Sequence, residues 1–311
     1  MRRAVAAGSG IALSSGPLLA LGAEPPRAIM VLVPDIGEPF RSVFASIVEG
    51  IESRAPGRVS VLAVGPSNEQ GLADEVRRRE ARVVVALGRQ GLKALALLAG
   101  GVNAIAGCVV SVQESDLRGH PVYTLAPDPG LLFAHLRRLM PGVRRVSVVY
   151  DPRQSGWLIR RAREAARGVS LELDAHEAQD LPAALRHYQQ ILAAADASRD
   201  AVWLPQDATT VEEGAVLPLV LKASWNHSLA VFSSNVAHVK RGALFALYPD
   251  NGELGRTLGD AALRALQGGK PAEGVLPLRD VRSAINARTA AHLGIVLGTR
   301  IAGYDLVYPE P

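Results

Sequence analysis

Residues 241–271 read RGALFALYPDNGELGRTLGDAALRALQGGKP, and this order of residues predicts a strand, a turn and one helix. The apolar run 243–248 predicts the strand. Asp250 stands where a helix N-cap is expected, and Glu253, three residues later, completes a capping-box pair. Apolar residues recur at helical spacing along 254–266, so this helix is expected to bury one face.

The glycines of this stretch are explained by helix packing and helix termination. Gly268 and Gly269 end the helix, and Pro271 prevents its continuation. Gly255 and Gly259 lie inside the helix, where each costs about 1 kcal/mol relative to alanine. We therefore predict that this helix packs closely against a neighbour. No Gly-Lys-Ser/Thr triplet follows, so the stretch is not a phosphate-binding loop.

The rest of the chain alternates short apolar runs with helical patterns. Four apolar runs come first, at 28–33, 59–64, 82–88 and 104–112. After a proline- and glycine-rich segment at 113–130, four more follow, at 145–151, 169–175, 200–205 and 229–234. Continuous apolar runs are typical of strands buried on both faces. Their alternation with helices predicts an α/β chain with parallel sheets covered by helices.

The interruption near residue 120 separates two successive α/β units, and a second crossing between them is expected at about 236–241. We expect lobe 1 to comprise residues 24–120 and 240–272, and lobe 2 to comprise residues 121–239 and 273–311.

The first residues have the pattern of a secretory signal peptide. Arg2 and Arg3 form a positive start, an apolar stretch interrupted by Gly, Ser and Pro covers 4–21, and small residues allow cleavage near Ala23. We interpret residues 1–23 as a cleaved signal, which predicts a mature protein outside the cytoplasm, in the periplasm of a Gram-negative cell.

The composition indicates a folded protein and argues against several partners. Hydrophobic residues make up 48% of the 311 residues and charged residues 21%. The formal charge is +4, and no stretch interleaves basic with aromatic residues, so we expect neither nucleic acid nor a membrane surface as partner. No segment after the signal could span a membrane, so no stable membrane insertion is expected. The single cysteine, Cys108, lies in an apolar run and is expected to be buried.

Motifs of catalysis are missing from the sequence. It contains no nucleophile elbow, no HExxH or CxxC motif and no cluster of His and Cys at metal-ligand spacing. We therefore expect no catalytic residue, no metal site and no cofactor, and interpret the chain as a binding protein rather than an enzyme.

Residues 240–278, followed by INARTAAHLGI at 285–295, resemble the periplasmic substrate-binding proteins of ABC transporters, in the group of tryptophan- and tyrosine-type amino-acid binders. DAVWLPQDAT at 200–209 and LAVFSSN at 229–235 are similar to strand ends of the same family. The resemblance implies the type I periplasmic-binding-protein architecture. In that architecture two Rossmann-like lobes with parallel sheets are joined by three crossovers, and the ligand lies in the inter-lobe cleft.

Ligands of open α/β sheets lie at the carboxyl ends of strands, where helix N-termini present free N–H groups. The candidate ligand-binding residues follow the predicted strands: Asp35, Gly88, Arg89, Gln90, Ser111, Asp151, Gln206, Asp207 and Asn235. Arg89 is suited to hold a carboxylate through two hydrogen bonds, or is an ordinary surface arginine. For each of the three aspartates, a role as a helix cap is the simpler alternative and is placed ahead of ligand contact.

The chain departs from the family at two places that bear on the ligand. It has Asn235 where the family has an aspartate, and Asn251-Gly252 where relatives carry aromatic residues. Losing an acidic group removes the expected partner of an α-amino group, which puts an amino acid as ligand in question.

The resulting functional hypothesis is a monomeric periplasmic solute-binding protein that captures a small polar molecule, such as an amino acid or a carboxylate, for an ABC transporter permease. The alternative is a periplasmic sensory or partner-docking protein of the same fold that signals to a membrane protein.

Overall fold

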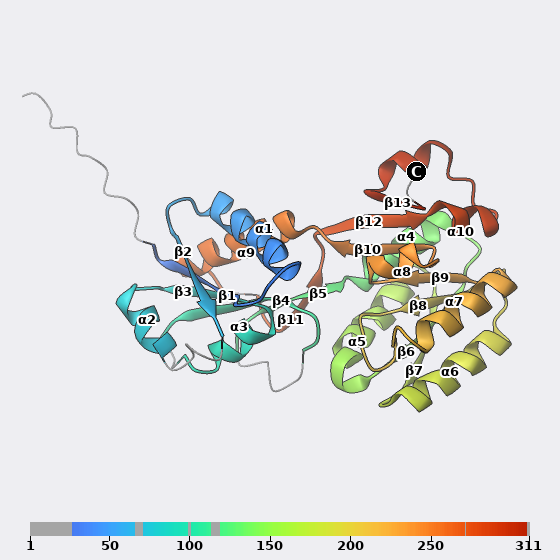
Figure 1. The fold of residues 1–311 in the computed structure, drawn as a ribbon, viewed down its shortest axis with the longest axis horizontal. Coiled ribbons are helices and arrows are strands. Elements are labelled where there is room, and N and C mark those ends of the chain that lie inside the picture. Colours follow the sequence, from blue (N-terminus) through green and yellow to red (C-terminus); the bar gives the residue numbers. More distant parts are fainter. Residues whose placement is uncertain (1–26, 66–70, 99–100, 113–118, 271, 310–311) are drawn as a thin grey trace, which may run out of the picture.

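The computed structural model describes residues 27–65, 71–98, 101–112, 119–270 and 272–309, and the predicted signal peptide lies outside them. The described chain forms two lobes that lie side by side, each built on one sheet covered by helices (Figure 1). This confirms the predicted α/β architecture with two parallel-dominated sheets.

Lobe 1 contains a six-stranded sheet in the order β11-β5-β4-β3-β1-β2. All of its strand pairs are parallel. The strands are β1 (Ile29–Pro34), β2 (Val59–Val64), β3 (Val83–Leu87), β4 (Asn103–Val109), β5 (Val122–Pro127) and β11 (Val275–Leu278). The helices are α1 (Phe40–Arg54), α2 (Leu72–Arg78), α3 (Gly88–Leu95) and α9 (Asn251–Leu266).

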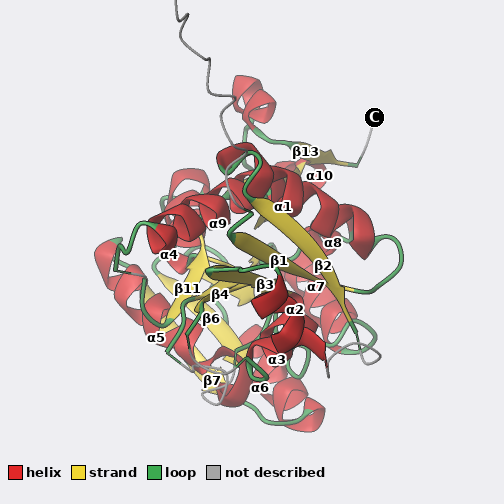
Figure 2. Cartoon of the chain, turned by 90° about the vertical axis from the view of Figure 1, so that its left-hand side faces the viewer, coloured by secondary structure: helices red, strands yellow, loops and turns green. Residues whose placement is uncertain are grey.

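Successive residues of the central strands of lobe 1 enter two separate cores. Ile29 and Val31 of β1 pack toward α1 and α9, whereas Met30 and Leu32 pack toward α2 and α3. Figure 2 shows the sheet between these two pairs of helices. Both faces are therefore buried, which explains why the strands read as continuous apolar runs.

Lobe 2 contains a seven-stranded sheet in the order β13-β12-β10-β9-β8-β6-β7. Only the β10–β12 pair is antiparallel among the described strand pairs of this sheet. The strands are β6 (Arg145–Tyr150), β7 (Glu172–Glu177), β8 (Asp200–Leu204), β9 (Ala230–Ser233), β10 (Phe245–Pro249), β12 (Val281–Asn286) and β13 (Leu306–Tyr308). The helices are α4 (Pro129–Leu139), α5 (Pro152–Gly168), α6 (Leu181–Ala194), α7 (Val216–His227), α8 (Val236–Lys240), α10 (Ala287–His292) and the 3-10 helix Gly298–Gly303.

The chain passes between the lobes after β5, after β10 and after β11, and these places correct the boundaries expected from the sequence. Those boundaries assign β5 and β11 to lobe 2 and β10 to lobe 1, and the structure places each strand in the other lobe. Backbone pairing is the reason: Val122 pairs with Ala106 of β4, Ala246 with Ser233 of β9, and Val275 with Val122. A strand that left earlier would leave the neighbouring backbone groups unpaired, so each crossing comes at a carboxyl end.

Helices α1 and α9 touch along their backbones (Figure 1). A Cβ added to Gly255 would lie 2.2 Å from the carbonyl oxygen of Ile47, and one added to Gly50 would lie 2.4 Å from the carbonyl oxygen of Gly252. A Cβ on Gly259 would lie 2.9 Å from Arg54 Cβ. The predicted close packing of Gly255 and Gly259 is confirmed, and its partner is α1.

The predicted cap of α9 forms in part. Asp250 Oδ1 accepts a hydrogen bond from the backbone N–H of Glu253 at 3.1 Å, which confirms the N-cap. The Glu253 carboxylate binds Arg256 instead of the backbone of Asp250, whose N–H donates to Asp280. The reciprocal half of the capping box is therefore absent, because the crossing strand supplies a different acceptor.

We expect Gly255→Ala to lower the free energy of unfolding by about 1–3 kcal/mol or more, because the new methyl group would overlap the α1 backbone. Gly252→Ala is the matched control, since its Cβ would approach Asp250 Oδ1 no closer than 3.6 Å. The midpoint of urea denaturation measures both changes. Equal midpoints for the two variants would contradict the packing argument.

His135 of α4 is a buried histidine held neutral by its surroundings. Its Nδ1 lies 2.8 Å from Arg138 Nη2, and its Nε2 lies 3.0 Å from the Tyr304 hydroxyl. Because arginine can only donate, Nδ1 accepts and Nε2 carries the proton. Burial, assisted by the positive charge of Arg138, lowers the pKa of His135 from 6.5 to about 4.

A lowered histidine pKa predicts acid sensitivity. Between pH 6.5 and about 4 the unfolded chain binds a proton that the folded His135 does not, so stability falls as pH falls. The maximum slope from one such group is about 1.4 kcal/mol per pH unit. We expect His135→Gln to flatten the pH dependence of the free energy of unfolding in this window, measured by urea denaturation. The exposed His227→Gln should leave it unchanged, and a wild-type slope in His135→Gln would refute the assignment.

Candidate functional site

The carboxyl ends of the parallel strands of both sheets point toward the facing lobe. β5 is parallel to its neighbours in lobe 1 and leads from its carboxyl end into lobe 2. β10 is parallel to β9 and leads from its carboxyl end back into lobe 1. The edges at which an α/β sheet binds ligands therefore face each other across the crossovers.

In lobe 1, four of the five predicted site residues lie at the ends of two neighbouring strands, β1 and β3. Asp35 directly follows β1, and its backbone N–H donates to Val64 of β2. Gly88, Arg89 and Gln90 directly follow β3 and form the first turn of α3. Gly88 has φ +69°, a conformation that favours glycine, and turns the chain from strand to helix.

Ser111, the fifth residue of this group, lies two residues beyond β4 and is half-buried. β4 pairs with β3 in parallel register, so Ser111 belongs to the same edge of the sheet as Gly88.

In lobe 2, Asp151 and Asp207 join the ends of two neighbouring strands, β6 and β8. Asp207 is 3% exposed, and its Oδ2 accepts from the backbone N–H of Asp151 and from the Ser155 hydroxyl, each at 2.8 Å. Its Oδ1 accepts from the backbone N–H groups of Thr209 and Thr210, each at 3.1 Å. Asp207 thus stabilises the loop after β8 and the start of α5, while the N-cap positions of the helices α5 and α7 are held by Asp151 and Ala215.

Asp151 is itself the N-cap of α5. It accepts from the backbone N–H of Arg153 at 3.0 Å and pairs with the Arg153 guanidinium at 2.7 Å. This guanidinium, with further hydrogen bonds, lowers the pKa of the Asp151 carboxyl despite its burial. Gln154 Nε2 and Asp151 both bind the Thr209 hydroxyl, so the ends of β6 and β8 form one hydrogen-bonded unit.

Asn235 is the N-cap of α8 and accepts from the backbone N–H of Ala237 at 3.0 Å. Its Nδ2 lies 3.4 Å from His238 Nε2, and its backbone N–H donates to the Ser233 hydroxyl. Asn235 therefore has a structural role at the end of β9, beside the ends of β8 and β6.

Two glutamine side chains differ from these satisfied groups. The Oε1 atoms of Gln90 and Gln206 are buried, and neither has a hydrogen-bond partner in the part of the chain that the structure describes. Gln90 begins α3 after β3 of lobe 1, and Gln206 follows β8 of lobe 2. An unpaired buried acceptor costs about 1–3 kcal/mol, so each position calls for a donor from outside the chain. The sequence predicts Gln90 and Gln206 as site residues from their positions after strands. It does not predict that their Oε1 atoms lack a hydrogen-bond partner among the described residues.

A cavity of about 420 Å³ opens beside Asp35. Its lining includes Arg41, Phe44 and Glu49 of α1, which strand-end reasoning does not include. The helix that follows a strand end carries such residues in its first turns, and this spacing is the signal that could have found them. Phe40, at the start of α1, is 59% exposed next to this opening.

Neither a metal-ligand cluster nor a membrane-spanning helix is present in the described ranges. No group of three or more His, Cys, Asp or Glu side chains is placed there to hold a metal ion. Among the same residues no helix has both the length and the apolar character needed to cross a membrane. Cys108 is buried, as expected, and burial raises the pKa of its thiol to about 12.

Solved structures of low sequence identity share this fold. An ABC domain in complex with L-Trp from Streptococcus pneumoniae is 18% identical, covers 90% of this chain and 99% of its own, and has a TM-score of 0.54. A substrate-binding protein with adhesive properties from Clostridium difficile, in a ligand-free open form, is 13% identical, with coverages of 91% and 100% and a TM-score of 0.64. A conserved domain protein from Vibrio cholerae is 16% identical, with coverages of 90% and 99% and a TM-score of 0.56.

A family comparison gives the more specific result. No curated protein matches the chain. The family of ABC transporter substrate binding proteins matches residues 134–305, more than half of the 311 residues. This match confirms the resemblance found in residues 200–295. The chain belongs to the family of ABC transporter substrate-binding proteins.

Proposed function

We propose that this protein captures a small polar molecule between its two lobes and delivers it to an ABC transporter permease. The observation that carries the proposal is a pair of buried acceptors, Gln90 Oε1 and Gln206 Oε1, for which the described part of the chain supplies no donor. They lie at strand ends of different lobes, on edges that face each other. A molecule that satisfies both would bridge the lobes.

The acceptors constrain the chemistry of the ligand. An amide oxygen accepts hydrogen bonds, so the ligand must present hydroxyl, ammonium or amide N–H groups. A carboxylate on the same ligand suits the first turn of α3, which has no acidic residue and includes Arg89. A hydroxy acid or an amino acid combines these groups, and Asp35 and Ser111 add polar atoms at the same edge.

The remaining predicted residues are assigned to the same site with a different role. Asp151, Asp207 and Asn235 use their side chains to fix the ends of β6, β8 and β9. Their positions around Gln206 make them the support of the lobe 2 half of the site. Binding then closes the lobes by a hinge at the crossovers.

Delivery to a permease requires that the protein work outside the cytoplasm. The signal peptide proposed for residues 1–23 supplies this location, and we place the mature protein in the periplasm as a monomer.

Substitution of Gln90 or Gln206 is expected to raise the stability of the ligand-free protein and to weaken ligand binding. A thermal-shift screen of hydroxy acids, amino acids and sugars should find a ligand that adds about 2.7 kcal/mol of stability at 100 times its Kd. Gln90→Leu and Gln206→Leu should each stabilise the ligand-free protein, because an unpaired acceptor is removed, and each should abolish the ligand-induced shift.

The exposed Gln189→Leu is the control and should change neither quantity. Unchanged ligand binding in both glutamine variants would contradict the assignment of Gln90 and Gln206 to the solute site. If no solute shifts the melting temperature of the wild type, solute capture is wrong and the sensory role gains support.

Asp207 should behave as a structural residue. We expect Asp207→Ala to lower the free energy of unfolding by roughly 2–3 kcal/mol, since four donors lose a buried charged acceptor. Asp74→Ala, whose side chain is 78% exposed, serves as the control. Urea denaturation of the ligand-free protein measures both. A wild-type stability in Asp207→Ala would show that its carboxylate is held for the ligand rather than for the fold.

A further inference from the structure

A second cavity, of about 410 Å³, lies in lobe 2 between α7, the end of α8 and the start of α10. Gly242 lines it and precedes β10, whose carboxyl end leads to lobe 1. Asn286 lines it at the end of β12, which runs antiparallel to β10. The cavity therefore lies at the amino-terminal edge of the sheet, the edge farthest from the proposed solute site.

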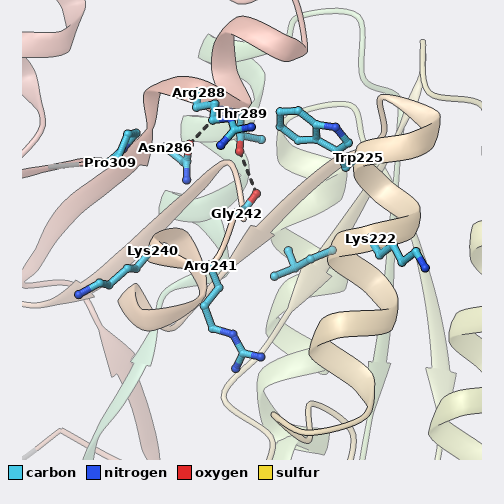
Figure 3. A pocket seen from close by; sticks show the side chains of 10 residues that line it. Lys222, Trp225, Lys240, Arg241, Gly242, Asn286, Arg288, Thr289 and Pro309 are labelled. Atoms are coloured by element: carbon cyan, nitrogen blue, oxygen red, sulfur yellow. Dashed lines mark hydrogen bonds between the residues drawn. The ribbon is translucent and has the colours of Figure 1, made fainter. Parts of the chain in front are cut away.

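Four cations line this cavity without an acidic residue in its lining: Lys222, Lys240, Arg241 and Arg288. They arrive from separate elements, as Figure 3 shows, with Lys222 on α7, Lys240 and Arg241 at the end of α8 and Arg288 on α10. The ammonium groups of the two lysines point away from each other in this view. Mutual repulsion favours such an arrangement when no anion lies between the positive charges.

Neutralisation of this charge within the chain is incomplete. Arg241 lies 3.7 Å from a carboxylate oxygen of Glu213. Among the described residues, no ion pair within 4.0 Å includes Lys222, Lys240 or Arg288. Arg288 is moreover the second residue of α10, the end of a helix at which a positive charge is unfavourable.

Arg288 is held by an aromatic ring instead of an acid. Its guanidinium carbon lies 5.5 Å from the centre of the Trp225 ring. Trp225 is 38% exposed and stacks on His292, with 3.9 Å between ring centres and 9° between planes. The ring thus positions Arg288 at the wall of the cavity. The guanidinium N–H groups of Arg288 remain available to an anion that enters the cavity.

The floor of the cavity is rigid and already satisfied. Asn286 donates from Nδ2 to the Val239 carbonyl at 2.9 Å and accepts from the backbone N–H of Thr289 at 2.9 Å. The Thr289 hydroxyl donates to the Gly242 carbonyl at 3.0 Å. These contacts bind the start of α10 to the end of α8, so the cationic side chains are presented from a fixed frame.

We propose that this cavity is a second binding site, for a small anion that carries at least two negative charges on phosphate or carboxylate groups. Lysine and arginine side chains from three helices around one cavity, with no acidic residue in its lining, are the chemistry that recognises such anions. The volume lies in the range of small-molecule sites. Because the site lies at the opposite edge of the sheet, its occupancy does not depend on the solute site.

Calorimetric titration of the mature protein with pyrophosphate and with citrate, at constant ionic strength, tests the proposal. We expect one anion per chain, and the stronger of the two probes identifies whether phosphate or carboxylate is the preferred group. Lys240→Ala and Arg288→Gln should each weaken binding on the order of tenfold, since each removes one charge-assisted contact. Lys222→Ala is a further variant that removes no side-chain hydrogen bond or ion pair among the described residues, so it reports on binding even if Arg288→Gln misfolds.

Lys270→Ala is the matched control, because its side chain is 84% exposed, follows α9 of lobe 1 and does not line the cavity. Gln90→Leu, which tests the solute site, should leave anion binding intact, so failure of either proposal is distinguishable from failure of the other. The inference is overturned if neither probe binds beyond the level seen with chloride. It is equally overturned if the Lys240 and Arg288 variants bind like the wild type, or if Lys270→Ala weakens binding as much as they do.

Discussion

Two aspartates at the crossovers determine how the rest of the structure is arranged. Asp128 caps α4 and binds the Arg279 guanidinium at 2.6 Å, and Asp250 caps α9 and binds Arg282 at 3.1 Å. Their backbone N–H groups donate to carbonyl oxygens within 278–280, so the three crossing segments are tied together. Both arginines are more than half exposed, so each ion pair adds little stability. The effect of each ion pair is to fix the position of the crossing segments.

This tie directs the carboxyl ends of both sheets toward each other, and the chemistry of the two edges follows from it. At the facing edges, Asp151, Asp207 and Asn235 satisfy backbone groups, whereas the Oε1 atoms of Gln90 and Gln206 have no hydrogen-bond partner among the described residues. At the far edge of lobe 2, Lys222, Lys240, Arg241 and Arg288 line the second cavity. The sheet of lobe 2 thus has one end whose carboxylates are already hydrogen-bonded within the protein and another end lined by cations, which suits ligands of different chemistry.

Local residue patterns predicted the elements well because their causes are local. The cap at Asp250 needs only the N–H group three residues later, and glycines spaced four residues apart in a helix indicate a close helix contact whichever helix is the partner. The wrong boundaries around β5, β10 and β11 have the opposite cause. A strand has the same continuous apolar sequence in either lobe, because both sheets bury their strands on two faces. The lobe to which a strand belongs depends on which distant strand pairs with it.

The sequence by itself determined the α/β class, the strand ends at which polar residues gather, and the family, since strand periodicity, helix caps and glycine spacing act over a few residues. Only the tertiary structure decided which of those polar side chains already have hydrogen-bond partners within the protein. Asp207 and Gln206 are adjacent residues after β8. Within the described ranges the Asp207 carboxylate accepts from four donors, whereas Gln206 Oε1 accepts from none. Hydrogen-bond satisfaction is a property of three-dimensional neighbours. The sequence hides the cationic cavity for the same reason, because α10 comes to lie beside α7 and α8 only in the folded chain.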